Sequence, residues 1–360
     1  MHIDMNEWGW TAERERAFRE VAEPGDGFGR VALEHTHLYR IYTERGDMLA
    51  EVAGRLRHQA QGRGDYPAVG DWVVIRYREA DNRAVIHGIL PRTSKFSRKV
   101  AGNVTDEQIV AANVDTVFLV NALNLDFNIR RLERYLILAW ESGANPVVLL
   151  TKADLCEEAE RREKVAEAEA AAMGVPVHVV SAAEGEGLAE LAPYFGQGRT
   201  VALLGSSGVG KSTLVNALYG DAIMAVSGIR EGDDKGRHTT THRELVRLPG
   251  GGVLIDTPGM RELQLWHADE GLGQGFRDVE ELAAHCRFGD CGHNREPGCA
   301  VQEALADGRL AADRYESYLK LQRELAYLAR KEDKALQLKE KERWKKIHMD
   351  VRRSGRHGGE

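Results

Sequence analysis

The stretch that decides the fold is "LLGSSGVGKSTLVNALYG", Leu203 to Gly220. Within it, Gly205–Ser212 fits the pattern G-x-x-x-x-G-K-[ST], and it lies between an apolar strand and a helix, as a phosphate-binding loop requires. Its glycines let backbone N–H groups turn inward around a phosphate, and the following helix adds the positive end of its dipole. The stretch therefore predicts a P-loop nucleotide-binding domain.

Each position of this loop is expected to contact the nucleotide or its metal ion. Lys211 is expected to reach the β- and γ-phosphates in catalysis, and Ser212 to place its hydroxyl on Mg²⁺. The other nucleotide contacts expected in this stretch are Gly205, Ser206, Ser207, Gly208, Val209, Gly210 and Thr213.

The segments around the loop predict a parallel sheet. Continuous apolar runs, typical of strands buried on both faces, occupy residues 114–120, 145–151, 175–181, 199–205 and 251–257. Helical patterns alternate with these runs at 129–143, 157–173 and 211–220. Such a βαβ series predicts a doubly wound α/β sheet, with ligand loops at the carboxyl ends of its strands.

Two of these strand ends carry residues suited to a guanine base. "TKAD" (Thr151–Asp154) ends the second run, and Asp154 can accept both N1–H and N2–H of guanine, a pair of donors that adenine lacks. The stem of Lys152 can cover the base plane. Ser181 and Ala182 end the next run, where the N–H of Ala182 can reach O6. These residues predict a site for GTP and GDP, in which Thr151 and Ser181 complete the two loops.

The last apolar run ends in "DTPG" (Asp256–Gly259). An aspartate that holds Mg²⁺ through water is expected there, with the Gly259 amide facing the γ-phosphate. Upstream lies "GRHTTTHREL" (236–245), where Thr240 is preferred among three adjacent threonines as a second Mg²⁺ contact, although an inert connecting loop has a similar composition. The motifs run base reader, phosphate loop, switch and DxxG, a cyclic rotation of the usual order. The sequence predicts a circularly permuted GTPase.

Residues 28–90 have a different pattern, with short β-segments rich in Val, Ile and Tyr between Gly, Asp and Asn. They predict a small barrel of the oligonucleotide-binding (OB) type. Six aromatic residues lie along it, and we expect most of them to be barrel core, with a base-stacking face as the alternative. They are Phe28, Tyr39, Tyr42, Tyr66, Trp72 and Tyr77.

Charge is unevenly distributed in this chain, whose net charge is −7. Residues 27–100 hold 13 Lys and Arg against 8 Asp and Glu, and residues 320–360 hold 13 against 7, so the remainder is acidic. Basic ends suit a nucleic-acid partner, although an uneven solvated surface gives the same counts. The sequence contains neither an apolar run of membrane-spanning length nor a signal-peptide pattern, so no membrane contact and a cytoplasmic location are expected.

A possible metal site lies near the C-terminal end in "CRFGDCGHNREPGC" (286–299). Cys286, Cys291, His293 and Cys299 provide three thiolates and one imidazole, which suit a closed, structural Zn²⁺ site. His285 is the alternative imidazole. Beyond residue 269 no strand is expected, and a long helix is expected over about 311–346.

The permuted order, "PAVGDWV" (67–73), "GRHTTT" (236–241), "DTPGMRE" (256–262) and the cysteine spacing resemble those of the ribosome small-subunit-dependent GTPase A family. The resemblance covers residues 25–345 and favours His293 as the metal ligand. It implies an N-terminal OB barrel, a central circularly permuted GTPase and a C-terminal helical zinc domain. The expected division is an extension (1–26), an RNA-binding barrel with linker (27–100), the GTPase domain (101–269) and the zinc-binding domain with a basic tail (270–360). Residues 1–24 have no counterpart in the resemblance.

The family implies a GTP hydrolase that binds the small (30S) ribosomal subunit and its 16S rRNA, acts late in subunit maturation, and is stimulated by the subunit. A monomer is expected. Met260 stands where Ras-like enzymes place a water-orienting Gln, so intrinsic hydrolysis is expected to be slow. His238 is the nearest polar side chain able to position water, and the resemblance also points to it, although an exposed loop histidine is the alternative.

Two other functions fit parts of the pattern. One is an RNA-binding assembly module that uses the nucleotide as a structural or switch ligand. The other is a P-loop kinase or ATPase, which would require that Asp154 has no part in base choice.

Overall fold

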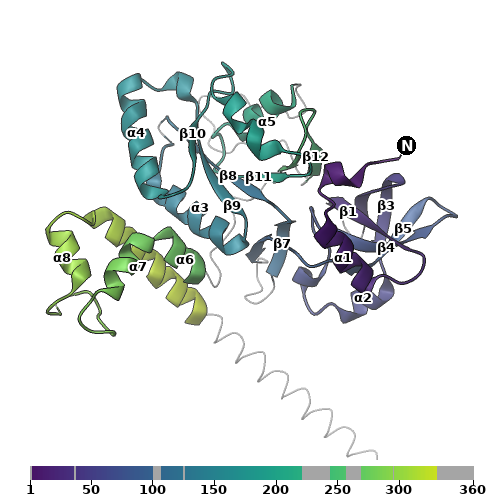
Figure 1. Ribbon diagram of the computed structural model, residues 1–360, viewed down its shortest axis with the longest axis horizontal. Helices are drawn as coiled ribbons and strands as arrows, with labels where there is room; N and C mark the ends of the chain where they lie inside the picture. Colours follow the sequence, from purple (N-terminus) through teal and green to yellow (C-terminus); the bar gives the residue numbers. More distant parts are fainter. Residues whose placement is uncertain are drawn as a thin grey trace, which may run out of the picture. The chain divides into compact units, whose positions relative to one another are not determined.

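The structure is a computed structural model (Figure 1), and it describes residues 2–35, 38–99, 107–124, 126–220, 244–256, 269–294 and 296–330. The chain forms two compact units. The first joins Met1–Arg98 with Gln108–Gln264, and the second joins Lys99–Glu107 with Leu265–Glu360. None of the helices in the described part has the length and apolar character needed to cross a membrane.

A closed five-stranded barrel forms the N-terminal part of the first unit. Its strands are β1 (Asp26–His35), β2 (Leu38–Thr43), β3 (Gly46–Val52), β4 (Trp72–Arg78) and β5 (Arg83–Ile89). They pair in the order β1-β2-β3-β5-β4, and β4 also pairs with β1, which closes the sheet. The short helix α2 (Gly54–Gln59) and a 3-10 turn, η2 (Arg63–Asp65), connect β3 to β4. This topology confirms the predicted OB-type barrel.

The aromatic residues of the barrel are mostly packed against other side chains. Tyr39 and Trp72 are buried, and Tyr39 belongs to the barrel core with Val31, Ile41 and Ile75. The core interpretation therefore holds for these two rings. Phe28, Tyr42, Tyr66 and Tyr77 are half-buried, and of these Tyr66 and Tyr77 also pack against the barrel core.

The N-terminal segment, for which the sequence suggested no role, packs onto this barrel. It contains η1 (Met5–Trp8) and α1 (Ala12–Val21). Trp10 stacks on Phe28, with ring centroids 3.7 Å apart and ring planes 4° from parallel. The ring centroids of Trp8 and Tyr42 are 4.0 Å apart. The chain's own tryptophans thus pack against one face of each of these two rings, and a base cannot stack on the faces that they cover.

The second part of this unit is a doubly wound sheet. Its parallel strands are β8 (Thr116–Ala122), β9 (Asn145–Thr151), β10 (Val177–Val179), β11 (Thr200–Leu204) and β13 (Val253–Asp256). The order is β10-β9-β8-β11-β13, and β12 (Glu244–Arg247) lies antiparallel beside β13. On its other side β12 pairs with β1 of the barrel, where Leu33 lies opposite Glu244. The connecting helices are α3 (Ile129–Ser142), α4 (Glu158–Ala171) and α5 (Lys211–Tyr219), together with the 3-10 segments η3 (Ala153–Leu155) and η4 (Leu188–Phe195). The predicted strands and helices are confirmed, whereas β12 was not predicted.

The strands are held by burial on both faces, as their apolar runs predicted. Phe118, Leu149, Val201 and Leu254 are at most 2% exposed and form one core cluster with Leu214 of α5. A pair of strands outside this sheet, β6 (Lys95–Lys99) and β7 (Glu107–Ala112), connects it to the barrel. The boundary expected at residue 100 falls between these two strands, and the four-part division of the chain stays a prediction.

The barrel and the sheet meet around one buried arginine. Arg30 of β1 is fully buried, and its guanidinium donates to Gly70 O (3.4 Å), Asn113 O (3.4 Å), Thr200 Oγ1 (2.8 Å) and Trp8 O. Burial lowers the pKa of Arg30 to about 9. Because the acceptors come from the N-terminal segment, the barrel and the sheet, this side chain ties all three together.

The C-terminal unit is helical in the residues that are described. It contains α6 (Asp269–Gly275), α7 (Arg277–Ala284), α8 (Ala300–Ala306) and helical residues 312–330. Arg314 forms an ion pair with Asp278 (3.0 Å) and lies 4.2 Å from the Phe276 ring centroid, which joins the last helix to α7. The helix predicted from residue 311 is present as far as the description extends.

Candidate nucleotide and metal sites

The predicted phosphate loop connects β11 to α5. Gly208 and Gly210 have φ of +75° and +99°, which side-chain-bearing residues rarely adopt. A Cβ on Gly205 would lie 2.6 Å from Val120 O, so this position also requires glycine. Lys211 Nζ donates to Gly205 O (2.7 Å) and Ser206 O (2.6 Å), which holds the ammonium over the loop. Such a loop can bind a phosphate through its backbone N–H groups and Lys211.

The other predicted contacts of this loop lie around it. Val209 is buried, Ser207 is exposed, and Ser212 and Thr213 are half-buried in the first turn of α5. The amides and hydroxyls of this turn can therefore face a phosphate and its metal ion.

The predicted base-reading residues come from two neighbouring strand ends. Thr151 ends β9, and Asp154 lies exposed in η3. Ser181, which follows β10, donates its hydroxyl to Asp154 Oδ1 at 2.5 Å, and half-buried Ala182 comes next. Since β9 and β10 are parallel, both loops emerge at the same edge of the sheet. The structure thus brings the TKAD and Ser-Ala segments together.

A hydrogen bond joins the base-reading loop to the phosphate loop. Thr151 Oγ1 donates to Val209 O at 2.6 Å, and Thr151 is 3% exposed. Many GTPases have Asn at the position of Thr151, and here the threonine hydroxyl makes a direct contact with the phosphate loop. Lys152, the next residue, has φ of +59°, which turns the chain sharply from β9 into η3.

The remaining predicted nucleotide contacts are only partly within the described residues. Asp256 ends β13, which pairs in parallel with β11, so its backbone lies at the same sheet edge as the phosphate loop. His238, Thr240, Gly259 and Met260 lie outside the described residues.

Two residues that lie outside the predicted motifs also contact the phosphate loop. Arg131 of α3 donates to Ser206 Oγ at 2.6 Å, and Asp126 accepts from that hydroxyl at 2.8 Å. Arg131 lies 75 positions before Ser206, in a helix that reads as an ordinary amphipathic segment, so no local sequence signal reveals the contact.

The four predicted metal ligands form one cluster. Their ligand atoms all lie within 4.8 Å of one another, so Cys286, Cys291, His293 and Cys299 could hold a metal ion. His293 Nδ1 is 3.5 Å from the Sγ atoms of Cys286 and Cys299, which are 3.8 Å apart. Tetrahedral coordination with metal–sulfur bonds of about 2.3 Å and metal–nitrogen bonds of about 2.0 Å gives ligand separations of roughly 3.5–3.8 Å. The geometry therefore fits a four-coordinate ion.

The alternative imidazole has a different partner. His285 Nδ1 lies 2.6 Å from Glu281 O at the end of α7, and this histidine is exposed. The four ligands of the cluster lie between α7 and α8, and Cys299 occupies the N-cap position of α8.

A doubly wound sheet whose base-reading loops precede the phosphate loop in the chain defines a circularly permuted GTPase. Comparison with known proteins agrees: a family model described as RsgA GTPase matches residues 89–266. The chain is 49% identical over 359 residues to the small ribosomal subunit biogenesis GTPase RsgA of Opitutus terrae, covering 97% of each. With the protein of that name from Methanosarcina acetivorans it shares 42% identity over 347 residues, 96% of this chain and 92% of the relative.

Solved structures give the same result. YjeQ from Thermotoga maritima aligns with a TM-score of 0.64 and 30% identity over 84% of this chain and 99% of its own. YloQ, described as a circularly permuted GTPase, aligns with a TM-score of 0.60 and 25% identity, and the alignment covers 85% of this chain and 97% of YloQ. The chain belongs to the RsgA GTPase family, and it is a GTPase.

Proposed function

We propose that this protein hydrolyses GTP while bound to the small ribosomal subunit, late in that subunit's maturation in the cytoplasm. The observation that carries the proposal is the base-reading and phosphate-binding constellation in a chain whose relatives are named small ribosomal subunit biogenesis GTPases. The expected partners are 16S rRNA and GTP or GDP, and the protein acts as a monomer.

The nucleotide contacts follow from the sheet edge. Asp154 accepts N1–H and N2–H of guanine, and the amide of Ala182 donates to O6. The backbone of Gly205–Gly210 surrounds the β-phosphate, while Lys211 binds the β- and γ-phosphates. Mg²⁺, which would neutralise developing charge on the phosphates, would be held by Ser212, Thr240 and, through water, Asp256, with the Gly259 amide toward the γ-phosphate.

Hydrolysis in this family member is expected to depend on its partner. Met260 cannot orient water, because a thioether is at most a weak acceptor. We propose that His238 positions the attacking water, and that the ribosomal subunit holds it in place. Intrinsic turnover is then slow and is stimulated by the subunit.

We also propose that the metal of the cysteine cluster is Zn²⁺. Three thiolates with one imidazole favour zinc among the common divalent ions, and four protein ligands leave no open position for catalysis. The ion would hold the loop between α7 and α8 in shape.

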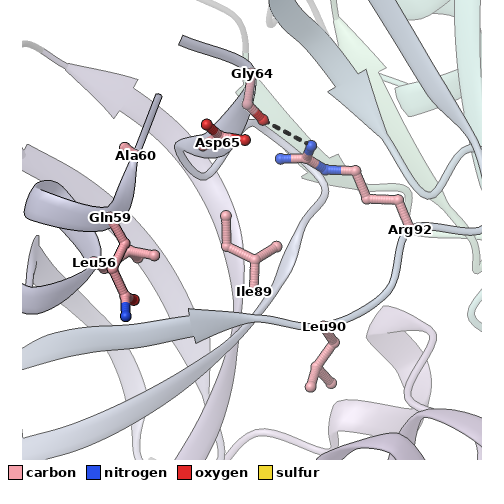
Figure 2. Close-up of a pocket in the computed structure, with 8 residues that line it drawn as sticks. All are labelled: Leu56, Gln59, Ala60, Gly64, Asp65, Ile89, Leu90 and Arg92. Atoms are coloured by element: carbon pink, nitrogen blue, oxygen red, sulfur yellow. Dashed lines mark hydrogen bonds between the residues drawn. The ribbon is translucent and has the colours of Figure 1, made fainter. Parts of the chain in front are cut away.

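The barrel offers a basic surface for RNA at α2. Arg55 and Arg57 are exposed there, beside a pocket of about 420 Å³ whose wall includes Leu56 and Ile89 (Figure 2). Arg92 also faces this pocket, but it donates to Gly64 O at 3.0 Å and therefore serves the barrel itself. Exposed arginines of this kind bind phosphates without reading sequence.

The test is GTP turnover by the full chain, titrated with purified small subunits at several salt concentrations, with ATP as the control nucleotide. We expect slow GTP hydrolysis alone, strong stimulation by subunits, weakening of that stimulation as salt rises, and no ATP turnover. Absence of stimulation at every salt concentration would contradict the ribosomal partner. GTP binding without turnover under any condition would favour the RNA-binding assembly module instead.

A further inference from the structure

Three side chains form a closed hydrogen-bonded group at the beginning of the phosphate loop. Arg131 Nη1 donates to Asp126 Oδ1 (3.0 Å), Asp126 Oδ2 (2.9 Å) and Ser206 Oγ (2.6 Å). The Ser206 hydroxyl in turn donates to Asp126 Oδ2 at 2.8 Å. Asp126 precedes α3, and Arg131 lies in its first turn, where its own N–H is capped by Asn128. The group therefore links the start of α3 to the second residue of the loop.

We propose that Arg131 and Asp126 are positioning residues, which hold Ser206 and thereby keep the phosphate loop in its nucleotide-binding shape. The proposal rests on the proposed role of Gly205–Ser212 as the phosphate-binding loop. It adds two residues outside every motif of the nucleotide site.

The need for this contact follows from the competition for Lys211. Its ammonium donates to the carbonyls of Gly205 and Ser206, and a phosphate in the loop competes for the same ammonium. When Lys211 turns toward the phosphate, the first half of a glycine-rich loop loses two hydrogen bonds. The bond from Arg131 and the bond to Asp126 use the Ser206 side chain, so they are compatible with a bound phosphate.

The second half of the loop has its own anchor of the same kind. Thr151 donates to Val209 O at 2.6 Å, as described above. The loop is thus fixed at Ser206 from the start of α3 and at Val209 from the end of β9. Fixing both halves before a ligand arrives lowers the conformational entropy lost on binding.

The charges of the group distinguish positioning from simple attraction. Arg131 and Asp126 are 29% and 40% exposed and form an ion pair, so together they carry no net charge toward a phosphate. If Arg131 acted only through its positive charge, removal of the Asp126 charge would strengthen nucleotide binding. If the pair positions Ser206, the same change weakens binding, because the two charged acceptor oxygens shared by Arg131 and the hydroxyl are replaced by one neutral oxygen.

The experiment measures dissociation constants for GTP and GDP and steady-state turnover of the full chain. The variants are Arg131→Ala, Asp126→Asn, Ser206→Ala and the double variant Arg131→Ala/Ser206→Ala. Arg162→Ala is the matched control, because Arg162 is an exposed helical arginine whose ion pair is with Glu158 of its own helix α4. We expect each single variant to weaken both nucleotides about tenfold, which is the low end for loss of a hydrogen bond to a charged group. The control should change neither constant.

The double variant tests the proposed route through Ser206. Because Arg131 acts through that hydroxyl, the double variant should bind no more weakly than the worse single variant, and Arg131→Lys should restore part of the affinity. Tighter binding by Asp126→Asn, fully additive losses in the double variant, or unchanged binding by Arg131→Ala would each overturn the proposal. Lys211→Ala distinguishes failure of the positioning proposal from failure of the phosphate-loop assignment. If Lys211→Ala also leaves nucleotide binding unchanged, Gly205–Ser212 is not the nucleotide site.

Discussion

Base specificity is the property of this site that a single atom exchange tests most directly. In Asp154→Asn, one carboxylate oxygen becomes an NH₂ group, so the side chain can no longer accept both guanine donors. The amide can instead donate to the C2 carbonyl of xanthine. The variant is therefore expected to lose affinity for GTP and to prefer xanthosine triphosphate.

The size of the loss follows from the contacts of the carboxylate. Hydrogen bonds to a charged group contribute about 1.5–3 kcal/mol each. Asp154 is exposed and one of its oxygens already accepts the Ser181 hydroxyl at 2.5 Å, so solvent and that hydroxyl compete and the low end applies. In the variant one bond is lost, the other is made to a neutral oxygen, and the new NH₂ group faces a guanine N–H donor. Together these changes amount to about 3 kcal/mol, which corresponds to a roughly hundredfold increase in the dissociation constant for GTP.

Competition binding with a fluorescent guanine nucleotide, displaced by GTP, xanthosine triphosphate and ATP, measures this change. Ser181→Ala is the matched control: it removes the hydroxyl that orients Asp154 but leaves the carboxylate, so affinity should fall modestly without a change in base preference. If Asp154→Asn keeps its preference for GTP, the TKAD segment does not recognise the base. The hydrogen bond from Ser181 to Asp154 would then not serve base recognition.

Three further predictions concern other parts of the molecule. Chelation of the metal should unfold mainly the C-terminal unit and leave nucleotide binding intact, as judged by limited proteolysis and nucleotide titration, because metal binding supplies folding free energy there; protein purified without chelators should contain one zinc per chain, and freely titratable thiols at Cys286, Cys291 and Cys299 would contradict the site. His238→Ala should abolish stimulation by small subunits with nearly unchanged GTP affinity, and normal stimulation of the variant would remove His238 from the mechanism. Arg30→Met should lower the free energy of unfolding by about 3 kcal/mol or more in urea denaturation, because it removes the guanidinium donor from Asn113 O and Thr200 Oγ1 at a buried site; a loss no greater than that of Arg76→Met, at an exposed barrel arginine, would refute this role.

The fold was predictable where burial alone determines the sequence pattern. Strands such as β8 and β9 lie between other strands with both faces covered, so most of their residues are apolar and the run is visible in the sequence. The β12 strand, between β13 and β1, has only four residues, of which one is buried, so it leaves no such pattern. The N-terminal segment was missed for another reason. Its fit depends on tertiary contacts such as Trp10 against Phe28, which no local pattern encodes.

The same distinction applies to the sites. Glycines with positive φ, the Asp154 carboxylate and four clustered metal ligands are required residue types at fixed local spacings, so motifs identify them. The Arg131 contact with Ser206 depends instead on how β8 and β11 pair in the sheet, which the sequence does not express locally. The same holds for the Thr151 contact with Val209.

The junction at Arg30 has a consequence for the order in which the chain is synthesised. The acceptors of this guanidinium lie 22, 40, 83 and 170 positions away, and the most distant, Thr200, begins the strand before the phosphate loop. A nascent barrel that has left the ribosome therefore contains an arginine whose last partner is not yet translated. Its packing can be completed only after the nucleotide-binding strand β11 has emerged. A prematurely terminated chain that lacks β11 would therefore carry a barrel in which Arg30 has one acceptor fewer.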